Sequence, residues 1–209
     1  LSEKTDYRQN NEPPRRGAAA FLRDNMNESD FKEKTTSSQL IYDGRIMQVY
    51  CDDIVLPDGK PSKREYVRHS GGAGVLAVDD EGFVYLVSQF RYPYGKNTIE
   101  IPAGKRERGE DPRVCAEREL EEETGLKADR IELLATVYPT PAYTDEVLYV
   151  YLATGLRSVR SHLDDGEFLN VRKMKFEDAL ALADSGAVND SKTLIAIYKY
   201  ALMRRSDTR

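Results

Sequence analysis

Short apolar runs, and apolar residues set among polar ones, recur along this chain between clusters of turn-forming residues. The turn signals include 57–60 (PDGK) and 79–82 (DDEG), each flanked by segments with strand character. The uninterrupted apolar run 75–78 is typical of a strand buried on both faces. We therefore predict strands at 62–69, 75–78, 83–90, 98–101, 131–138, 146–153 and 167–175, and a β-hairpin within 31–69 that turns at 57–60.

Helical patterns dominate the C-terminal part of the chain, where helices are predicted at 176–184 and 190–204. A third helix is predicted at 112–124. Strands with helices before and after them favour the α/β class, with a sheet held between helices. The apolar face of the last helix comprises Leu194, Ile195, Tyr198, Ala201 and Leu202.

The chain divides by composition into three parts. Residues 1–30 are polar and include the run NNEPPRR, so they are expected to form a flexible leader, with 18–26 fitting either a short helix or a disordered tail. The hairpin region follows at 31–69, and the main domain is expected at 70–209. No internal repeat is visible in the sequence.

Charge and composition narrow the possible partners. The 209 residues are 32% charged and 40% hydrophobic with a net charge of −5, which argues against nucleic acid as the main partner. An anionic ligand would then need local cations or a metal. Two cysteines do not make a disulfide framework, and no apolar run reaches membrane-spanning length, so we expect a cytoplasmic protein that does not bind membranes.

The stretch 104–126 carries the most specific chemistry. A helix at 112–124 places three of its glutamates at i, i+3 and i+4, which stacks their carboxylates on one face. Like charges crowded together repel, so this face is expected to bind a hard cation with oxygen ligands, Mg²⁺ or Mn²⁺. The three are Glu119, Glu122 and Glu123, whereas Glu117 and Glu121 are expected to point to water.

The residues at both ends of this helix are as specific as its face. Asp111 is a good N-cap, Pro112 a good first helical residue, and Gly125 supplies a left-handed C-terminal turn. In the preceding Pro-Ala-Gly segment, Gly104 allows the backbone to come close to a ligand.

The whole stretch fits the pattern G-x5-E-x7-R-E-U-x-E-E-x-G-U, where U is aliphatic, at every position. It resembles the Nudix box of the Nudix hydrolases, and a match at nine specified positions is far more specific than a lone glycine motif. A charged surface helix is the alternative, but it leaves the loop and cap residues unexplained. The matching residues are Gly104, Glu110, Arg118, Glu119, Leu120, Glu122, Glu123, Gly125 and Leu126.

The resemblance implies the Nudix fold, an α/β/α sandwich with a mixed sheet, and cleavage of a nucleoside diphosphate linked to another group. Metal bound by such carboxylates neutralises a diphosphate and activates water for in-line attack on phosphorus. By position, Arg118 would orient the glutamates through charged hydrogen bonds, and Glu122 would be both ligand and catalytic residue. The implied metal ligands are Glu119, Glu122, Glu123 and the Ala103 carbonyl.

Residues outside the box resemble the ADP-ribose pyrophosphatase subfamily. Pro141 lies 15 residues after Leu126, where the subfamily has a proline in an S-P-G loop, although Thr140 and Ala142 replace the serine and glycine here. Glu146 matches a glutamate that contacts the nucleoside half of the ligand. An ordinary turn proline is the alternative for Pro141.

Four more matches extend this resemblance. Arg64 lies where the subfamily has an arginine near adenine, and Arg91 where it has one on the diphosphate, although a solvated surface arginine is the alternative for each. Within the acidic segment 163–168, Glu167 matches a metal-binding glutamate and Asp165 a general base, with an ordinary acidic turn as the alternative for Asp165. His69 and His162 lack metal-ligand spacing and are assigned to surface or structure.

The subfamily resemblance implies Mg²⁺-dependent hydrolysis of ADP-ribose to AMP and ribose 5-phosphate, with Mn²⁺ as a possible substitute. Two alternatives stay open: a hydrolase of another nucleotide sugar, such as GDP-mannose or an ADP-sugar, and a ligand sensor without turnover. In this subfamily the N-terminal hairpin exchanges between subunits. We therefore expect a homodimer in which residues 31–69 contribute to the partner's adenine pocket.

Overall fold

The structure is a computed structural model that describes residues 28–159 and 168–207. Internal contacts divide the chain into two compact units. Among the described residues, one unit holds those up to Ser37 together with Asp52–Lys63, and the other holds Ser38–Cys51 together with those from Arg64 onwards. The predicted leader segment 18–26 lies outside the described residues.

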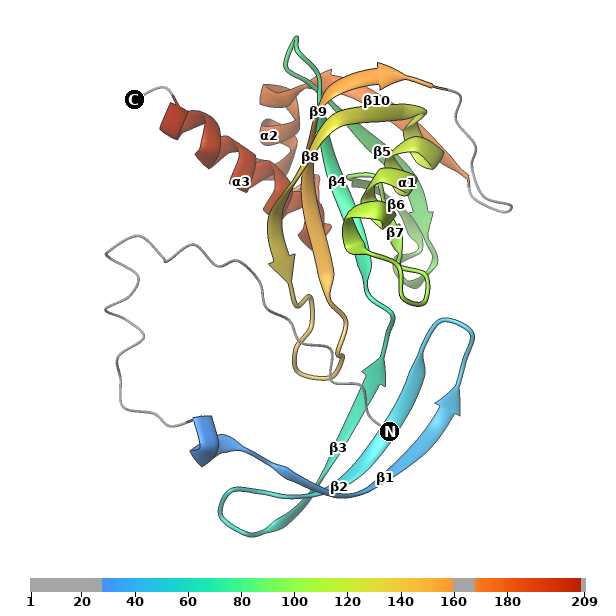
Figure 1. The fold of residues 1–209 in the computed structure, drawn as a ribbon, viewed down its shortest axis with the longest axis vertical. Coiled ribbons are helices and arrows are strands. Elements are labelled where there is room, and N and C mark those ends of the chain that lie inside the picture. The colour runs from blue at the N-terminus through green and yellow to red at the C-terminus, as the bar shows by residue number, and fades with distance from the viewer. Residues whose placement is uncertain (1–27, 160–167, 208–209) are drawn as a thin grey trace. The chain divides into compact units, whose positions relative to one another are not determined.

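The N-terminal region begins with a short 3-10 helix, η1 (Glu28–Phe31), and forms a three-stranded sheet in the order β1–β2–β3 (Figure 1). The predicted turn at 57–60 is confirmed, because Leu56 N–H donates to the Lys60 carbonyl at 2.9 Å. A second turn, where Gly44 N–H donates to the Met47 carbonyl at 3.0 Å, adds one strand to the predicted hairpin. The strands are β1 (Lys34–Asp43), β2 (Gln48–Val55) and β3 (Pro61–Arg68).

A seven-stranded sheet forms the centre of the main domain. Five strands run in the order β10–β5–β4–β9–β8, while β6 pairs with β5 and β7 pairs with β4. The sheet is mixed, because β4 and β9 are parallel and the other pairs antiparallel. Its strands are β4 (Gly72–Val78), β5 (Phe83–Arg91), β6 (Lys96–Glu100), β7 (Ala103–Lys105), β8 (Leu126–Val137), β9 (Leu148–Ser158) and β10 (Leu169–Lys175).

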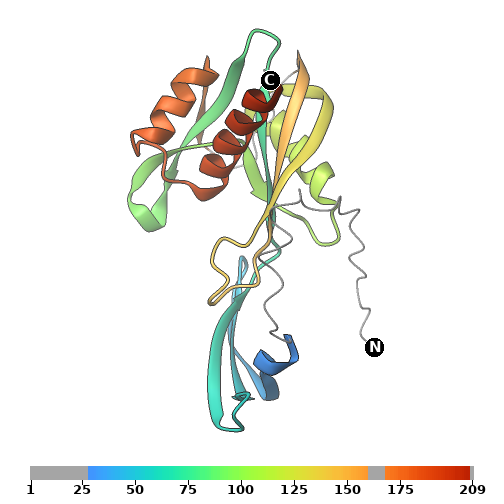
Figure 2. The ribbon, with the colours of Figure 1, turned by 90° about the vertical axis from the view of Figure 1, so that its left-hand side faces the viewer.

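Helices cover both faces of this sheet, as Figure 2 shows. Alternate residues of β4 explain the arrangement: Val75 and Ala77 pack in the cluster with α1, whereas Leu76 and Val78 pack in the cluster with α2 and α3. This confirms the predicted α/β/α sandwich. The helices are α1 (Pro112–Thr124), α2 (Phe176–Asp184) and α3 (Ser191–Asp207), with a 3-10 turn η2 (Tyr92–Tyr94) between β5 and β6.

The predicted elements of the main domain are largely confirmed, with several differences, of which two concern the box. β8 begins at Leu126, immediately after the helix, rather than at 131, because Leu126 is itself buried in the cluster under α1. β7 was not predicted; its three residues pair with Gly72–Gly74, so the Pro-Ala-Gly approach is part of the sheet. None of the described helices is long and apolar enough to cross a membrane.

Candidate active site

The box helix α1 begins and ends as its sequence predicts. The side chain of Asp111 accepts hydrogen bonds from Arg113 N at 2.8 Å and Val114 N at 3.4 Å, which satisfies N–H groups that have no partner within the helix. Gly125 has φ 66° and ψ 31°, the left-handed conformation that ends helices, and its N–H donates to the Glu121 carbonyl. Asp111 and Gly125 therefore define where α1 begins and ends.

The three glutamates of the predicted metal face lie on the protein side of α1. Glu119 and Glu123 are only 6% and 4% exposed, and Glu122 is partly buried. Arg118 Nη1 donates to Glu119 Oε1 at 2.7 Å and to Glu122 Oε2 at 2.8 Å, so it makes the predicted contact with two of them. Glu117 is largely exposed and pairs with Arg113 on the same helix, as expected for a residue facing water.

The buried carboxylates lie against the backbone of β7. Glu123 Oε2 accepts a hydrogen bond from Ala103 N at 2.9 Å. Glu119 occupies the space in front of Gly104, because a Cβ atom built there would collide with its carboxylate. Gly104 is therefore needed for close approach between backbone and carboxylate.

The loop before α1 is held by Glu110. Its carboxylate accepts from Arg118 Nε at 3.0 Å and from Glu107 N at 2.8 Å, and its carbonyl accepts from Arg106 Nε at 3.0 Å. The hydrogen bond from Arg118 lowers the pKa of Glu110, and the same bond raises the pKa of Arg118. Glu110 therefore fixes both the loop and the arginine that contacts the other glutamates.

These residues fit a divalent cation by donor chemistry. Carboxylates and a backbone carbonyl are the hard oxygen ligands that Mg²⁺ and Mn²⁺ prefer, and they are gathered at one end of β7. Within residues 28–159 and 168–207, however, no three carboxylate, histidine or cysteine side chains converge on one point between them. Arg118 Nη1 bridges Glu119 and Glu122, whereas Glu123 accepts from Ala103 N.

Arg91, predicted to bind the diphosphate, is engaged with a buried glutamate. Its Nε and Nη2 atoms each donate to one oxygen of Glu100 at 2.7 Å, forming a bidentate pair between β5 and β6. The hydrogen bond with Glu100 raises the pKa of Arg91, and Asp190 and Glu123 contribute smaller effects.

The predicted nucleoside-side residues lie on the β8–β9 loop and on β3. Pro141 is exposed and Glu146 partly buried, while Arg64 is exposed on β3. The loop packs on the end of β3, because Val67 N donates to the Tyr143 carbonyl at 2.8 Å and Asp145 N donates to the Val67 carbonyl at 3.1 Å. Thus the structure brings Glu146 to the end of β3, while Arg64 is an exposed residue of the same strand.

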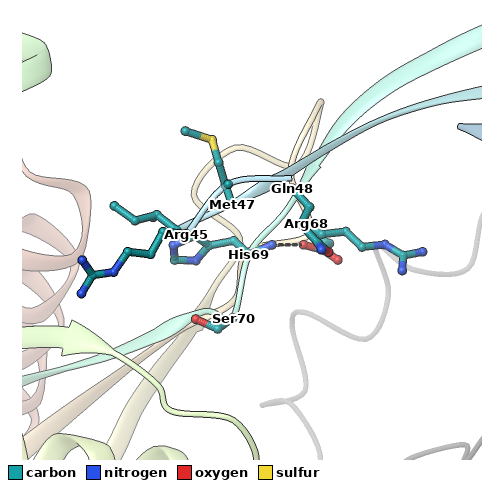
Figure 3. Close-up of a pocket in the computed structure, with 9 residues that line it drawn as sticks. Arg45, Met47, Gln48, Arg68, His69 and Ser70 are labelled. Atoms are coloured by element: carbon teal, nitrogen blue, oxygen red, sulfur yellow. Dashed lines mark hydrogen bonds between the residues drawn. The ribbon is translucent and has the colours of Figure 1, made fainter. Parts of the chain in front are cut away.

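A pocket of about 360 Å³ lies beside this junction (Figure 3). His69 N donates to Asp145 Oδ1 at 2.9 Å, the bond dashed in the figure, and His69 Nδ1 lies 3.3 Å from Glu146 Oε1. His69 is therefore in contact with the predicted site residue Glu146. The sequence did not predict this contact, because His69 was assigned to surface or structure for its lack of metal-ligand spacing. The lining residues are Gly44, Arg45, Ile46, Met47, Gln48, Arg68, His69, Ser70 and Asp145.

Aromatic side chains near the pocket are already paired with one another. The rings of Tyr50 and Tyr66 stack with centroids 5.5 Å apart, and the Arg68 guanidinium lies 4.7 Å from the Tyr50 centroid. Another tyrosine of the N-terminal region, Tyr42, is 58% exposed. Arg68 was missed from the sequence; its only signal was its place beside Tyr66 and His69 at the end of a strand. Asp165, Glu167 and His162 lie outside the described residues.

Fold and site together define a class: an α/β/α sandwich protein whose acidic helix offers oxygen ligands for a divalent cation. The profile of the NUDIX domain matches residues 68–196, and that of the nucleoside diphosphate sugar hydrolase N-terminal domain matches residues 33–67. The chain therefore belongs to the NUDIX family, as the box predicted. It is a Nudix hydrolase, a class that generally uses divalent metal ions.

Individual proteins agree with this assignment. An ADP-ribose pyrophosphatase of Bacillus subtilis (strain 168) is 45% identical over 168 residues, which cover 79% of this chain and 91% of that protein. A methanol dehydrogenase activator of Bacillus methanolicus is 42% identical over 169 residues, covering 80% and 91%. A crystal structure of an ADP compounds hydrolase superposes with a TM-score of 0.75 at 18% identity over 85% of this chain and 97% of that one, which supports the fold.

Proposed function

We propose that this enzyme hydrolyses the diphosphate of ADP-ribose to AMP and ribose 5-phosphate with Mg²⁺, and that Mn²⁺ can substitute. The observation that carries the proposal is the placement of Glu119 and Glu123 against the Ala103–Gly104 backbone, in a Nudix hydrolase similar to an ADP-ribose pyrophosphatase. Carboxylates and backbone carbonyls are the oxygen ligands that hard divalent cations prefer, and such cations in turn bind phosphates.

The metal would be held by Glu119, Glu122, Glu123 and the Ala103 carbonyl, with Glu167 as a further ligand. When bound, it would neutralise the diphosphate and lower the pKa of a water molecule. Arg118 keeps Glu119 and Glu122 in place through its two hydrogen bonds of 2.7 and 2.8 Å. Within this proposal, Glu122 and Asp165 remain the candidates for proton transfer.

Other residues would hold the substrate. Arg91 would bind the diphosphate with the part of its guanidinium that Glu100 does not occupy, since the pair with Glu100 uses only Nε and Nη2. Glu146 and Arg64 are proposed to bind the nucleoside half, and Gly104 and Pro141 to shape the backbone around the ligand. Contact of Glu146 with the partly buried His69 gives it a fixed place from which to do so.

We further propose a homodimer in which residues 31–69 form an N-terminal domain that contributes to the partner's site, ahead of a catalytic domain at 70–209. Large apolar side chains of this region are exposed, which is unusual unless another surface covers them. Light scattering at micromolar concentration should give twice the chain mass, and a purely monomeric protein would contradict the proposal. The exposed residues are Phe31, Leu40, Ile41, Tyr42, Ile46 and Met47. The cytoplasmic location stays a prediction, to be tested by cell fractionation.

The substrate is identified by measuring which candidate compounds the purified protein hydrolyses. The purified protein should release AMP from ADP-ribose in the presence of Mg²⁺ and lose activity when EDTA removes the metal. GDP-mannose and diadenosine polyphosphates, assayed in parallel, distinguish another nucleotide-sugar hydrolase from the proposed enzyme. Binding of ADP-ribose with no product from any of these substrates would support a sensor instead.

Variants test whether the carboxylates carry the reaction. Glu122→Gln and Glu123→Gln should each abolish turnover while the melting temperature stays near that of the wild type. Glu117→Gln is the matched control, because Glu117 lies on the same helix but pairs with Arg113 at the surface. Full activity in both Glu122→Gln and Glu123→Gln would refute the proposed site.

A further inference from the structure

A buried charged cluster lies at the end of β6, next to the box. The side chain of Glu100 is only 3% exposed, and its two oxygens accept hydrogen bonds from Arg91 Nε and Nη2, from Thr98 Oγ1 at 2.6 Å, and from Lys192 Nζ. Burial alone would raise the pKa of Glu100, but Arg91 and Lys192 outweigh it and lower that pKa to about 2. The carboxylate is therefore charged throughout the neutral range.

The same cluster ties helix α3 to the segment between β6 and β7. Lys192 Nζ also donates to Asp190 Oδ1 at 2.9 Å, and Asp190 Oδ2 caps α3 by accepting from Thr193 N at 3.0 Å. Thr193 Oγ1 in turn accepts from Ile101 N at 2.8 Å. Two positions after Ile101, the backbone of Ala103 donates to Glu123. The cluster thus lies next to the segment that contacts the box glutamate.

Stability alone is a weak reason to bury these charges. Apolar residues of similar volume often stabilise a core as well as a buried ion pair does, because the ions lose their hydration. What a bidentate pair does provide is direction, since the planar guanidinium can match both carboxylate oxygens in only one orientation. The cluster therefore fixes where Arg91 points.

Glu100 binds one edge of the Arg91 guanidinium, and another edge remains available to a ligand. Glu100 occupies Nε and Nη2, the side chain of Arg91 is 38% exposed, and Nη1 makes no hydrogen bond to any residue that the structure describes. Lys192, whose side chain is 10% exposed, shares Glu100 with Arg91. Lys192 also binds Asp190, so it links the carboxylate that orients Arg91 to the start of α3.

We propose that Glu100 and Lys192 are positioning residues that orient the Arg91 guanidinium so that its Nη1 edge meets the substrate diphosphate. The inference rests on the proposed function and deepens it, since it assigns a task to a side chain of α3 that lies 92 positions from Glu100 in the sequence. Neither Glu100 nor Lys192 touches the substrate in this arrangement; both act through Arg91.

A double-mutant cycle separates this role from a merely structural one. Arg91→Ala and Glu100→Gln should each raise KM for ADP-ribose by about ten- to one-hundredfold, the loss expected for one charged hydrogen bond, with much less change in kcat. Because Glu100 acts through Arg91, the double variant should have the KM of Arg91→Ala alone. A KM increase equal to the product of the two single effects would overturn the proposal.

Lys192 gives a second test with conservative rescue. Lys192→Met should raise KM, whereas Lys192→Arg, which keeps the positive charge, should have the KM of the wild type. An unchanged KM in Lys192→Met would count against the role of Lys192. Lys173→Met is the matched control, since Lys173 pairs with Asp79 on the β5–β10 side of the sheet and should leave KM unchanged. If Lys192→Met does not fold, Thr98→Val removes another donor to Glu100 and should raise KM in the same way.

The failure of this inference can be told apart from failure of the proposed function. If the wild type does not hydrolyse ADP-ribose, the proposed function fails, and the cycle is read instead from dissociation constants for ADP with Mg²⁺, measured by calorimetry. A non-additive cycle in ADP binding then supports the positioning role. Multiplicative losses refute it, whether or not ADP-ribose is the substrate.

Discussion

Substitution of Gly104 by alanine is the sharpest test of the site, because it adds one methyl group where Glu119 lies. That carbon would be 2.5 Å from Glu119 Oε2 and nearer still to Oε1 and Cδ, whereas real Cβ contacts are essentially never shorter than 3.0 Å. The carboxylate must therefore move by at least half an ångström. Because it is 6% exposed and bonded to Arg118 Nη1, this movement breaks an existing contact.

The expected effect falls on activity more than on stability. A displacement of about 1 Å in a catalytic site can cost about 100-fold in rate, so kcat/KM of Gly104→Ala should fall by roughly that factor. The Gly104 backbone lies outside the left-handed region, so alanine introduces no backbone strain there. We therefore expect the melting temperature to change by only a few degrees.

Gly82→Ala is the matched control with the opposite profile. Gly82 has φ 78°, and no atom lies within 4 Å of the position that an added methyl group would take, so alanine is strained but displaces no side chain. The cost of about 1–2 kcal/mol should lower the melting temperature by several degrees and leave kcat/KM unchanged. Steady-state kinetics with ADP-ribose and Mg²⁺, and thermal melts of both variants, decide the matter. Wild-type kcat/KM in Gly104→Ala would refute the placement of Glu119 at the reacting centre.

Three further predictions concern pH, capping and thiol reactivity. Since the pKa of Glu100 is lowered from 4.5 to about 2, its stabilising contribution is present above pH 4.5 and is lost as pH falls toward 2. Urea titrations should therefore show that the difference in unfolding free energy between wild type and Glu100→Gln narrows between pH 4.5 and pH 2. A constant difference over that range would contradict the prediction. Asp111→Ala should cost about 1 kcal/mol and lower the melting temperature by about 2–4 °C in calorimetry, because it removes the cap of α1; an unchanged melting temperature would show that the cap contributes nothing. Burial, followed by the charges of Glu110 and Glu119, raises the pKa of Cys115 to about 12. Iodoacetamide at pH 8 should therefore alkylate the partly exposed Cys51 and spare Cys115 until the protein unfolds. Equal labelling of the two cysteines in peptide mass spectrometry would contradict the burial of Cys115.

The sequence predicted best what depends on neighbours along the chain. The ends of α1 follow from Asp111, Pro112 and Gly125, and the alternation along β4 follows from the period of two in a strand covered on both faces. The extra strand β1 could also have been found locally, because Asp43-Gly44 is a recognised turn signal.

Contacts between distant parts of the chain could not be predicted in this way. Lys192 meets Glu100 only because α3 packs on the sheet, and nothing in the local pattern of α3 distinguishes this lysine from a solvated one. For the same reason Arg91 was predicted to bind phosphate without its carboxylate partner. Its identity pointed to the chemistry, but the partner that orients it comes from the neighbouring strand β6.

Repulsion along the acidic face explains only part of the site. Like charges on one helix face require compensation, but the structure supplies part of it internally, since Arg118 bridges Glu119 and Glu122 while Ala103 N–H binds Glu123. An acidic face alone therefore does not imply a metal. What favours one here is the donor chemistry combined with Gly104, because a side chain at that position would fill the place where backbone and carboxylate now meet. The glycine, rather than the number of glutamates, is the residue that distinguishes this site from an ordinary charged helix.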